Sequence, residues 1–198
     1  MLLGLTGGIA TGKSTFCRLL AERHPFVVFD ADTCVHNFLA EDPIVAQAVR
    51  GEFGPTVFAP DGSIERAALR AIVFQNPRQR KVLEQVLHPL VRRRWEDLHR
   101  ACRRDGRDLL ADIPLLFEVG AAASFDSTIL VAASRHTQED RLAARGIGSA
   151  TAQAMLASQW PVSDKFAPAT VVVWNDGTEA ALQCQAALLI ESLFPLTA

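Results

Sequence analysis

Lysine is scarce in this chain of 198 residues, and cysteine motifs, surplus charge and long apolar runs are absent. The four cysteines, at positions 17, 34, 102 and 184, form no C-x-x-C pair, which excludes a zinc ribbon or a thioredoxin-like motif. The 20 Lys and Arg nearly balance the 22 Asp and Glu, which argues against a nucleic-acid-binding surface. No run reaches the roughly 18 apolar residues of a membrane-spanning helix. We therefore expect a globular protein that binds neither nucleic acid nor membranes.

The beginning of the sequence and its cysteines bear on location. No charged segment followed by an apolar one opens the chain, so we expect no signal peptide and a cytoplasmic location. Scattered cysteines in a chain of this size are typical of reduced cytosolic thiols. Only 3 of the 20 basic residues are lysines, so each lysine merits attention, although a GC-rich genome would produce the same bias. Nothing in the sequence indicates an oligomeric state.

Short apolar runs alternate with amphipathic helical segments at both ends of the chain. Strands are expected at Leu2–Thr6, Phe26–Phe29, Leu109–Ile113, Thr128–Val131 and Val171–Trp174. Helices are expected at Ser14–Arg23 and Thr178–Leu193. Continuous apolar strands are typical of a parallel sheet covered on both faces, and the strand–helix–strand order requires right-handed crossovers. The sequence therefore predicts an α/β fold, a three-layer α/β/α arrangement with a parallel sheet core.

The middle of the chain has a helical pattern and little strand signal. One helical segment begins at Ser63–Glu65, and two more are expected at Pro77–Leu87 and Pro89–Arg104, with Pro89 in the first turn of the latter. A second helical stretch, Glu139–Gln159, is broken at Gly146–Gly148 and predicts a mobile helix pair. We expect a single domain, 1–198, with a core (1–40, 105–135 and 166–198), a helical insertion (41–104) and a lid (136–165).

The sequence Gly-Gly-Ile-Ala-Thr-Gly-Lys-Ser at residues 7–14 matches G-x-x-x-x-G-K-[ST] at every fixed position. It follows an expected strand and opens an expected helix, the context of a phosphate-binding loop. Glycines let backbone N–H groups surround phosphate oxygens, and the helix N-terminus adds its positive dipole end. Lys13 is expected to reach the β- and γ-phosphates of a nucleotide, and the Ser14 hydroxyl to ligate Mg²⁺. The expected nucleotide contacts are Gly8, Ile9, Ala10, Thr11, Gly12, Lys13, Ser14 and Thr15.

The loop alone does not say what happens to the nucleotide. A switch GTPase needs an N-K-x-D motif, and Asn175-Asp176 lacks the lysine, which argues against that class. A small-molecule kinase needs a base near the γ-phosphate, and Asp30 and Asp32 follow the second expected strand, where doubly wound folds bind ligands. We expect Asp32 to be the functional carboxylate and Asp30 to cap the helix that follows.

Taken together, these residues resemble the dephospho-coenzyme A kinase family. The similarity begins at Leu5–Ile9 and Gly12–Ser14 and runs in order, with compatible spacing, to about residue 177. The other similar segments are Asp30–Asp32, Arg66–Arg70 with Phe74, Leu87–Pro89, Ile113–Glu118, Gln138 with Arg141 and Arg145, and Asn175 with Gly177. The chain departs from the family at Thr170, where a carboxylate is usual, and at Met155, where the lid often has another arginine.

The resemblance implies a reaction and a set of roles. The γ-phosphate of ATP would pass to the ribose 3′-hydroxyl of dephospho-coenzyme A, with Asp32 as general base. Thr6, His88, Leu115 and Glu118 would lie in the acceptor site. Arg141 would hold phosphate from the lid and act in catalysis with Lys13, and Arg145 and Asn175 would contact the nucleotide.

Several residues keep two interpretations. Glu118 is either a surface residue or an acceptor-site carboxylate, and Asp112 either ends a strand or holds the water shell of magnesium. His88 is either a half-buried packing residue or a substrate contact. The arginines at 92–94 and 103–104 are either a solvated helix face or attract a phosphate-bearing acceptor. The tryptophans, at positions 95, 160 and 174, are expected to pack rather than to stack on adenine.

Two alternative activities also stay open. One is a kinase for another small hydroxylated acceptor, such as a nucleoside. The other is a nucleotide-binding regulator without transfer activity.

Overall fold

The computed structural model describes residues 1–195. The chain divides into two compact units: residues 1–29 together with the chain from residue 99 onward, and residues 30–98. The second unit begins at Asp30, earlier in the chain than the insertion boundary expected at residue 41. Within residues 1–195, no helix combines the length and the apolar character needed to cross a bilayer.

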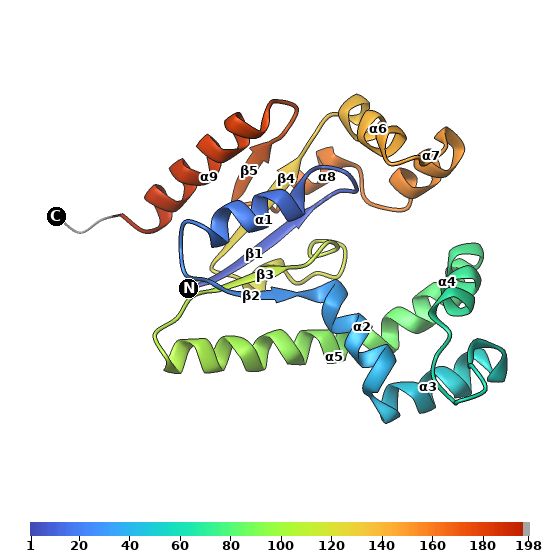
Figure 1. Cartoon of the computed structure of the whole chain (residues 1–198). Coiled ribbons are helices and arrows are strands. Elements are labelled where there is room, and N and C mark those ends of the chain that lie inside the picture. The colour runs from blue at the N-terminus through green and yellow to red at the C-terminus, as the bar shows by residue number, and fades with distance from the viewer. Residues whose placement is uncertain (196–198) are drawn as a thin grey trace. The chain divides into compact units, whose positions relative to one another are not determined.

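The first unit is built on one sheet. Within the described residues its five strands are β1 (Leu2–Gly7), β2 (Val27–Asp30), β3 (Leu109–Asp112), β4 (Ser127–Ala132) and β5 (Val171–Trp174). They lie in the order β2-β3-β1-β4-β5, and β1 pairs in parallel with both β3 and β4 (Figure 1). All the expected strands are therefore confirmed to within about two residues. Because parallel strands end at the same edge, the segments that follow them meet there.

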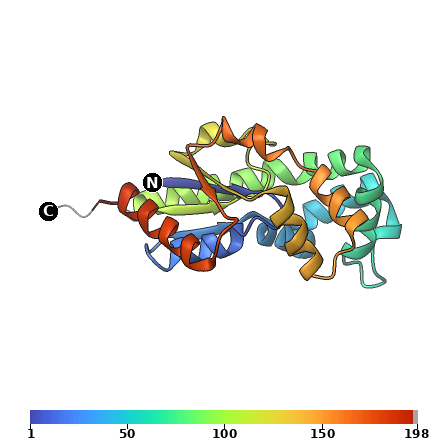
Figure 2. The ribbon, with the colours of Figure 1, turned by 90° about the horizontal axis from the view of Figure 1, so that it is seen from above.

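Helices cover both faces of this sheet. The helices α1 (Lys13–Ala21) and α9 (Glu179–Leu193) lie side by side over one face, where Phe16, Leu20 and Ala186 pack against strand residues (Figure 2). On the opposite side, α8 (Val162–Phe166) contacts β4. The expected three-layer arrangement is confirmed.

The lid stretch forms two helices, α6 (Arg135–Ala144) and α7 (Ser149–Ala157), which follow β4. Gly146 takes a positive φ of 77° between them, so the expected break is confirmed. Leu142 of α6 and Ala152 of α7 are buried together with Ala10, so the helix pair packs against the loop after β1.

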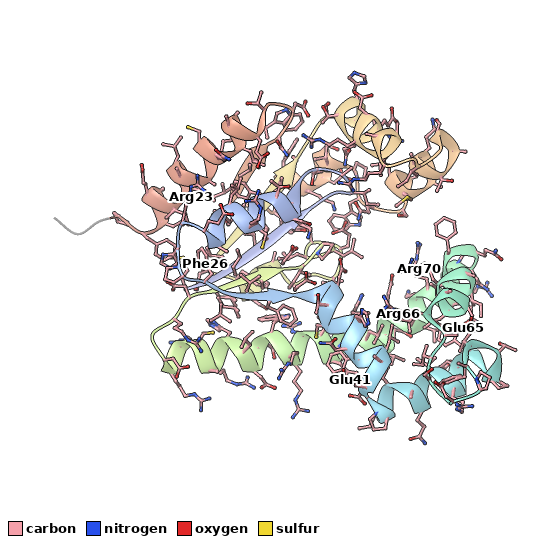
Figure 3. The ribbon with its side chains drawn as sticks, in the orientation of Figure 1. Arg23, Phe26, Glu41, Glu65, Arg66 and Arg70 are labelled. Carbon is pink, nitrogen blue, oxygen red and sulfur yellow. The ribbon has the colours of Figure 1, made fainter. Side chains whose placement is uncertain are left out.

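The second unit is helical. Its elements are α2 (Ala31–Glu41), α3 (Pro43–Phe53), the 3₁₀ turn η1 (Pro55–Val57), α4 (Arg66–Gln75) and the part of α5 (Pro77–Arg104) that precedes residue 99. Val45, Val49 and Leu69 are buried in its core. Asp30 caps α2 by accepting the Thr33 N–H at 2.7 Å, as expected. The side chains of Arg66 and Arg70 extend from the exposed face of α4 (Figure 3).

The structure corrects the expectation of two separate helices on either side of Pro89, because α5 is continuous. Residues 77–104 form one helix with Pro89 inside it, although an interior proline removes a hydrogen bond and costs about 3 kcal/mol. Leu87, Val91 and Trp95 follow one another at helical spacing and are all buried. One continuous apolar stripe thus passes the proline, and its packing stabilises an unbroken helix.

Candidate nucleotide-binding site

The loop between β1 and α1 has the backbone shape that a phosphate site requires. Gly12 has φ 92°, and Ala10 also lies in the left-handed region with φ 59°. A Cβ atom on Gly12 would lie 2.2 Å from the Asn175 side-chain nitrogen, so only glycine fits there. The helix α1 then begins at Lys13 without a side-chain cap among the described residues, which leaves N–H groups for an anion.

Amide side chains from three distant segments hold this loop. Gln138 Nε2 on α6 donates to the Ile9 carbonyl at 2.6 Å, and the Ile9 N–H donates to Gln159 Oε1 at 3.0 Å. Asn175 Nδ2, just after β5, donates to the Thr11 carbonyl at 2.8 Å. The backbone is thereby fixed before a ligand arrives. Sequence reasoning singled out Gln138 and Asn175 but missed Gln159, because no local pattern marks a glutamine that bonds a loop 150 residues away.

Arg141 lies against the same loop. Its Nη1 donates to the carbonyls of Ala10 and Thr11 at 3.1 and 3.2 Å, and its Nη2 donates to the Asn175 carbonyl at 2.9 Å. The guanidinium is thus placed beside the loop, while its contact with phosphate stays a prediction. Arg145 is the exposed C-cap residue of α6, and its contact with a nucleotide also stays a prediction.

Lys13 and Asp112 form an ion pair at the carboxyl edge of the sheet. Their side chains are only 13% and 9% exposed, so the pair is largely shielded from water. Asp112 therefore contacts the phosphate-loop lysine and does more than end a strand. Ser14, the next residue in α1, is exposed.

This donor set fits magnesium. A hydroxyl and a carboxylate beside a phosphate site are oxygen ligands of the kind that Mg²⁺ prefers. The ion usually keeps several of its bound waters and takes its other ligands from the protein and from substrate phosphates. Among residues 1–195, no group of three or more His, Cys, Asp or Glu offers an all-protein metal site. Ser14, with Asp112 acting through water, would hold the ion.

The residues expected to bind the acceptor fall in both units. Thr6 is buried and its hydroxyl donates to the Pro114 carbonyl at 2.9 Å, and Leu115 is half-buried in the same loop. Glu118 is no surface residue, because its carboxylate lies 2.6 Å from the Lys165 ammonium. Asp32 and His88 belong to the second unit, and both are exposed. Contact of these residues with a substrate stays a prediction.

Sequence reasoning also singled out Thr170 and the tryptophans. Thr170, where a carboxylate is usual, lies at the amino end of β5, and its hydroxyl accepts the Thr128 N–H at 3.1 Å. This departure therefore affects strand pairing and lies at the sheet edge away from the phosphate loop. Trp95 is buried as expected, whereas Trp160 and Trp174 are 46% and 44% exposed. Trp174 still packs against the ring of Phe166, and whether either ring stacks on a base stays a prediction.

A parallel sheet, a phosphate loop after its first strand and a lysine–aspartate pair at its carboxyl edge define a P-loop kinase fold. The fold is shared with a shikimate kinase from Acinetobacter baumannii, with a TM-score of 0.54 at 13% identity. The chain belongs to the dephospho-CoA kinase family, because the family model for dephospho-CoA kinase matches residues 1–181. Members of this family are ATP-dependent kinases.

Similar proteins cover almost the whole chain. A dephospho-CoA kinase from Anaeromyxobacter dehalogenans is 43% identical over 97% of this chain and 92% of its own length. A dephospho-CoA kinase from Chlorobaculum tepidum is 36% identical over 98% of this chain and 95% of its own length. The structure of dephospho-CoA kinase from Campylobacter jejuni has a TM-score of 0.73 at 26% identity, covering 97% of this chain and 96% of that chain.

Proposed function

We propose that this chain transfers the γ-phosphate of ATP to the ribose 3′-hydroxyl of dephospho-coenzyme A. The products are coenzyme A and ADP, and the reaction is the last step of coenzyme A biosynthesis. The observation that carries the proposal is the match to the family over residues 1–181, together with a phosphate loop held in place by Gln138 and Asn175 from distant segments. The four cysteines form no disulfide within residues 1–195, which suits a reaction in the reducing cytoplasm.

The phosphate loop binds and orients the donor. Its backbone N–H groups and the start of α1 surround the β- and γ-phosphates, and the Lys13 ammonium neutralises charge on them. Arg141, beside the loop, neutralises charge that develops on the transferring group. Mg²⁺, when bound, screens the phosphate oxygens. Arg145 and Asn175 complete the nucleotide contacts.

Asp32 acts on the acceptor. Its carboxylate accepts a hydrogen bond from the 3′-hydroxyl and takes the proton while the oxygen attacks the γ-phosphorus in line. The new bond joins O3′ to phosphorus, and the bond to the bridging oxygen of ADP breaks. Thr6, His88, Leu115 and Glu118 position the acceptor. Closure of α6 and α7 excludes water, which would otherwise hydrolyse ATP.

A panel of acceptors tests this function. The chain is incubated with ATP, Mg²⁺ and dephospho-coenzyme A, nucleosides or no acceptor; ADP is measured, and products are identified by mass. We expect acceptor-dependent ADP and a phosphorylated product with dephospho-coenzyme A alone. Phosphorylation of a nucleoside instead would assign another acceptor, and ATP binding without acceptor-dependent ADP would indicate a regulator. Lys13→Ala is the inactive control.

A further inference from the structure

A cavity of about 250 Å³ lies beside the phosphate loop. Its lining includes Gly8 and Thr11 of the loop, Gln138 of α6, and Gln159, Trp160 and Lys165 in and before α8. The lining contains two basic residues and no carboxylate. Sites for drug-sized ligands measure roughly 300–1,000 Å³, so this cavity suits a single bicyclic base better than a whole coenzyme.

The two glutamines present a defined hydrogen-bonding pair. The Ile9 peptide binds one end of each amide: its carbonyl accepts from Gln138 Nε2 and its N–H donates to Gln159 Oε1. These bonds fix which end of each amide is oxygen. Gln138 Oε1 is left as an acceptor and Gln159 Nε2 as a donor, with no partner for either within residues 1–195. A neighbouring acceptor and donor complement adenine, which offers its N6 amino group and a ring nitrogen.

Trp160 supplies an aromatic surface. Its indole lines the cavity and is 46% exposed, unlike the buried Trp95. A half-exposed aromatic ring on a cavity wall is a stacking platform for a base.

Lys165 supplies a buried cation. Its side chain is 1% exposed, and its only ion-pair partner in the described chain is Glu118, 2.6 Å away. That contact is not aligned as a hydrogen bond, so the ammonium keeps N–H donors without acceptors. A buried ammonium in this state favours a ligand that brings acceptor atoms, such as ring nitrogens or ribose oxygens.

We propose that this cavity binds the adenine of the acceptor, an inference that rests on the proposed function. In dephospho-coenzyme A the base and the reacting 3′-hydroxyl share one ribose. A base held against Gly8 and Thr11 therefore leaves the hydroxyl next to the loop that binds the γ-phosphate. The adenine of ATP, by contrast, is separated from its own γ-phosphate by a ribose and two phosphates. Glu118, one of the residues expected to bind the acceptor, also contacts the cavity through Lys165.

Steady-state kinetics of Trp160→Ala test the proposal. We expect KM for dephospho-coenzyme A to rise about tenfold or more through the lost stacking, with little change in KM for ATP or in kcat. Trp174→Ala is the matched control, because Trp174 is exposed to a similar extent (44%) and does not line the cavity. Trp160→Phe, which keeps a ring, should restore most of the acceptor affinity.

A binding measurement without turnover gives a second readout. Dephospho-coenzyme A added without ATP should quench tryptophan fluorescence in the wild type and in Trp174→Phe, but not in Trp160→Phe. A rise in KM for ATP rather than for the acceptor would assign the cavity to the donor and overturn the proposal. Unchanged kinetics and quenching in the Trp160 variants, with an active wild type, would overturn it while the proposed function stands. A wild type that never phosphorylates dephospho-coenzyme A would overturn both.

Discussion

The side-chain amide of Asn175 donates a hydrogen bond to the backbone carbonyl of Thr11 over 2.8 Å, across 164 positions of sequence. The backbone carbonyl of Asn175 accepts from Arg141 at 2.9 Å. Asn175 is 6% exposed, so water competes little for these bonds. The residue that follows β5 thus joins the loop after β1 to the helix α6.

Asn175→Asp should weaken ATP binding about tenfold or more and lower the free energy of unfolding by about 1–3 kcal/mol. The carboxylate cannot donate, and it places an acceptor against the Thr11 carbonyl. Calorimetric titration with ATP and chemical denaturation measure the two effects. Gln185→Glu is the matched control, because Gln185 also donates to a carbonyl, that of Trp174, but at an exposed site. Equal ATP affinity in Asn175→Asp and wild type would show that the loop does not depend on this bond.

Lys13→Ala should lower kcat by about a thousandfold or more, because Lys13 is the loop residue that carries charge to the phosphates. The change also removes an ion-pair partner of Asp112, so Asp112→Asn and the double variant complete a cycle. A coupling of about 0.5–3 kcal/mol in stability is expected for groups in contact. Lys81→Ala, at an exposed position, is the control. Turnover retained in Lys13→Ala would exclude the phosphate role.

Asp32→Asn should lower kcat about 10²- to 10⁴-fold while the Kd for ATP changes little, because a base acts on the acceptor and not on the nucleotide. Single-turnover assays and ATP titration separate the two quantities. Asp30→Asn is the matched control: Asp30 caps α2, and an asparagine side chain can still accept the Thr33 N–H, so both stability and kcat should change little. A near-normal kcat in Asp32→Asn would remove Asp32 as the base.

Local sequence patterns predicted the strands and the phosphate loop, because short-range residue preferences determine these elements. The strand Val171–Trp174 was expected at its observed bounds, and the phosphate loop was expected from spacing alone. The continuity of α5 was not expected, because Pro89 is a strong local signal for a helix break. The buried apolar stripe through Leu87 and Val91 outweighs that signal only in the folded protein.

Sequence reasoning assigned the residues that phosphate chemistry requires, and it missed residues whose role is to hold one another in place. Lys13 and Ser14 were assigned because phosphate chemistry requires them in this spacing. The pairing of Glu118 with Lys165 and the anchoring of Ile9 by Gln159 join residues far apart in sequence. Neither contact has a local pattern, since each depends on how the strands place the loops that follow them. The scarcity of lysine was the one signal that marked Lys165.

The pKa of Asp108 predicts a pH dependence of stability. Burial alone would raise it, but hydrogen bonds from the Met1 amine and from His24 outweigh burial and hold the pKa below its usual value. His24 in turn stacks on Phe194 and lies beside Phe26. A carboxyl group whose pKa is lower in the folded state stabilises the fold at pH values above its unfolded pKa, near 3.9. This stabilisation is lost as the pH falls through the folded pKa.

Asp108→Asn should therefore lower the free energy of unfolding by on the order of 1 kcal/mol at pH 7, and by less as pH approaches 3. Urea denaturation at pH 7, 5 and 3 measures the difference. Asp105→Asn, in an exposed ion pair with Arg107, is the control and should show little change. A difference that is the same at every pH would contradict a role for the carboxylate charge.

Pro89→Ala should stabilise the protein by about 1–2 kcal/mol and raise Tm by a few degrees. The change restores an N–H that can donate to the Gln85 carbonyl one turn earlier, and the freedom gained by the unfolded chain offsets part of the benefit. Pro77→Ala is the matched control, because Pro77 begins α5, where the missing N–H costs nothing. Scanning calorimetry of both variants gives the comparison. If Pro89→Ala lowered Tm, the proline itself would shape the packing of Leu87 and Val91, and the helix would continue because of Pro89 rather than in spite of it.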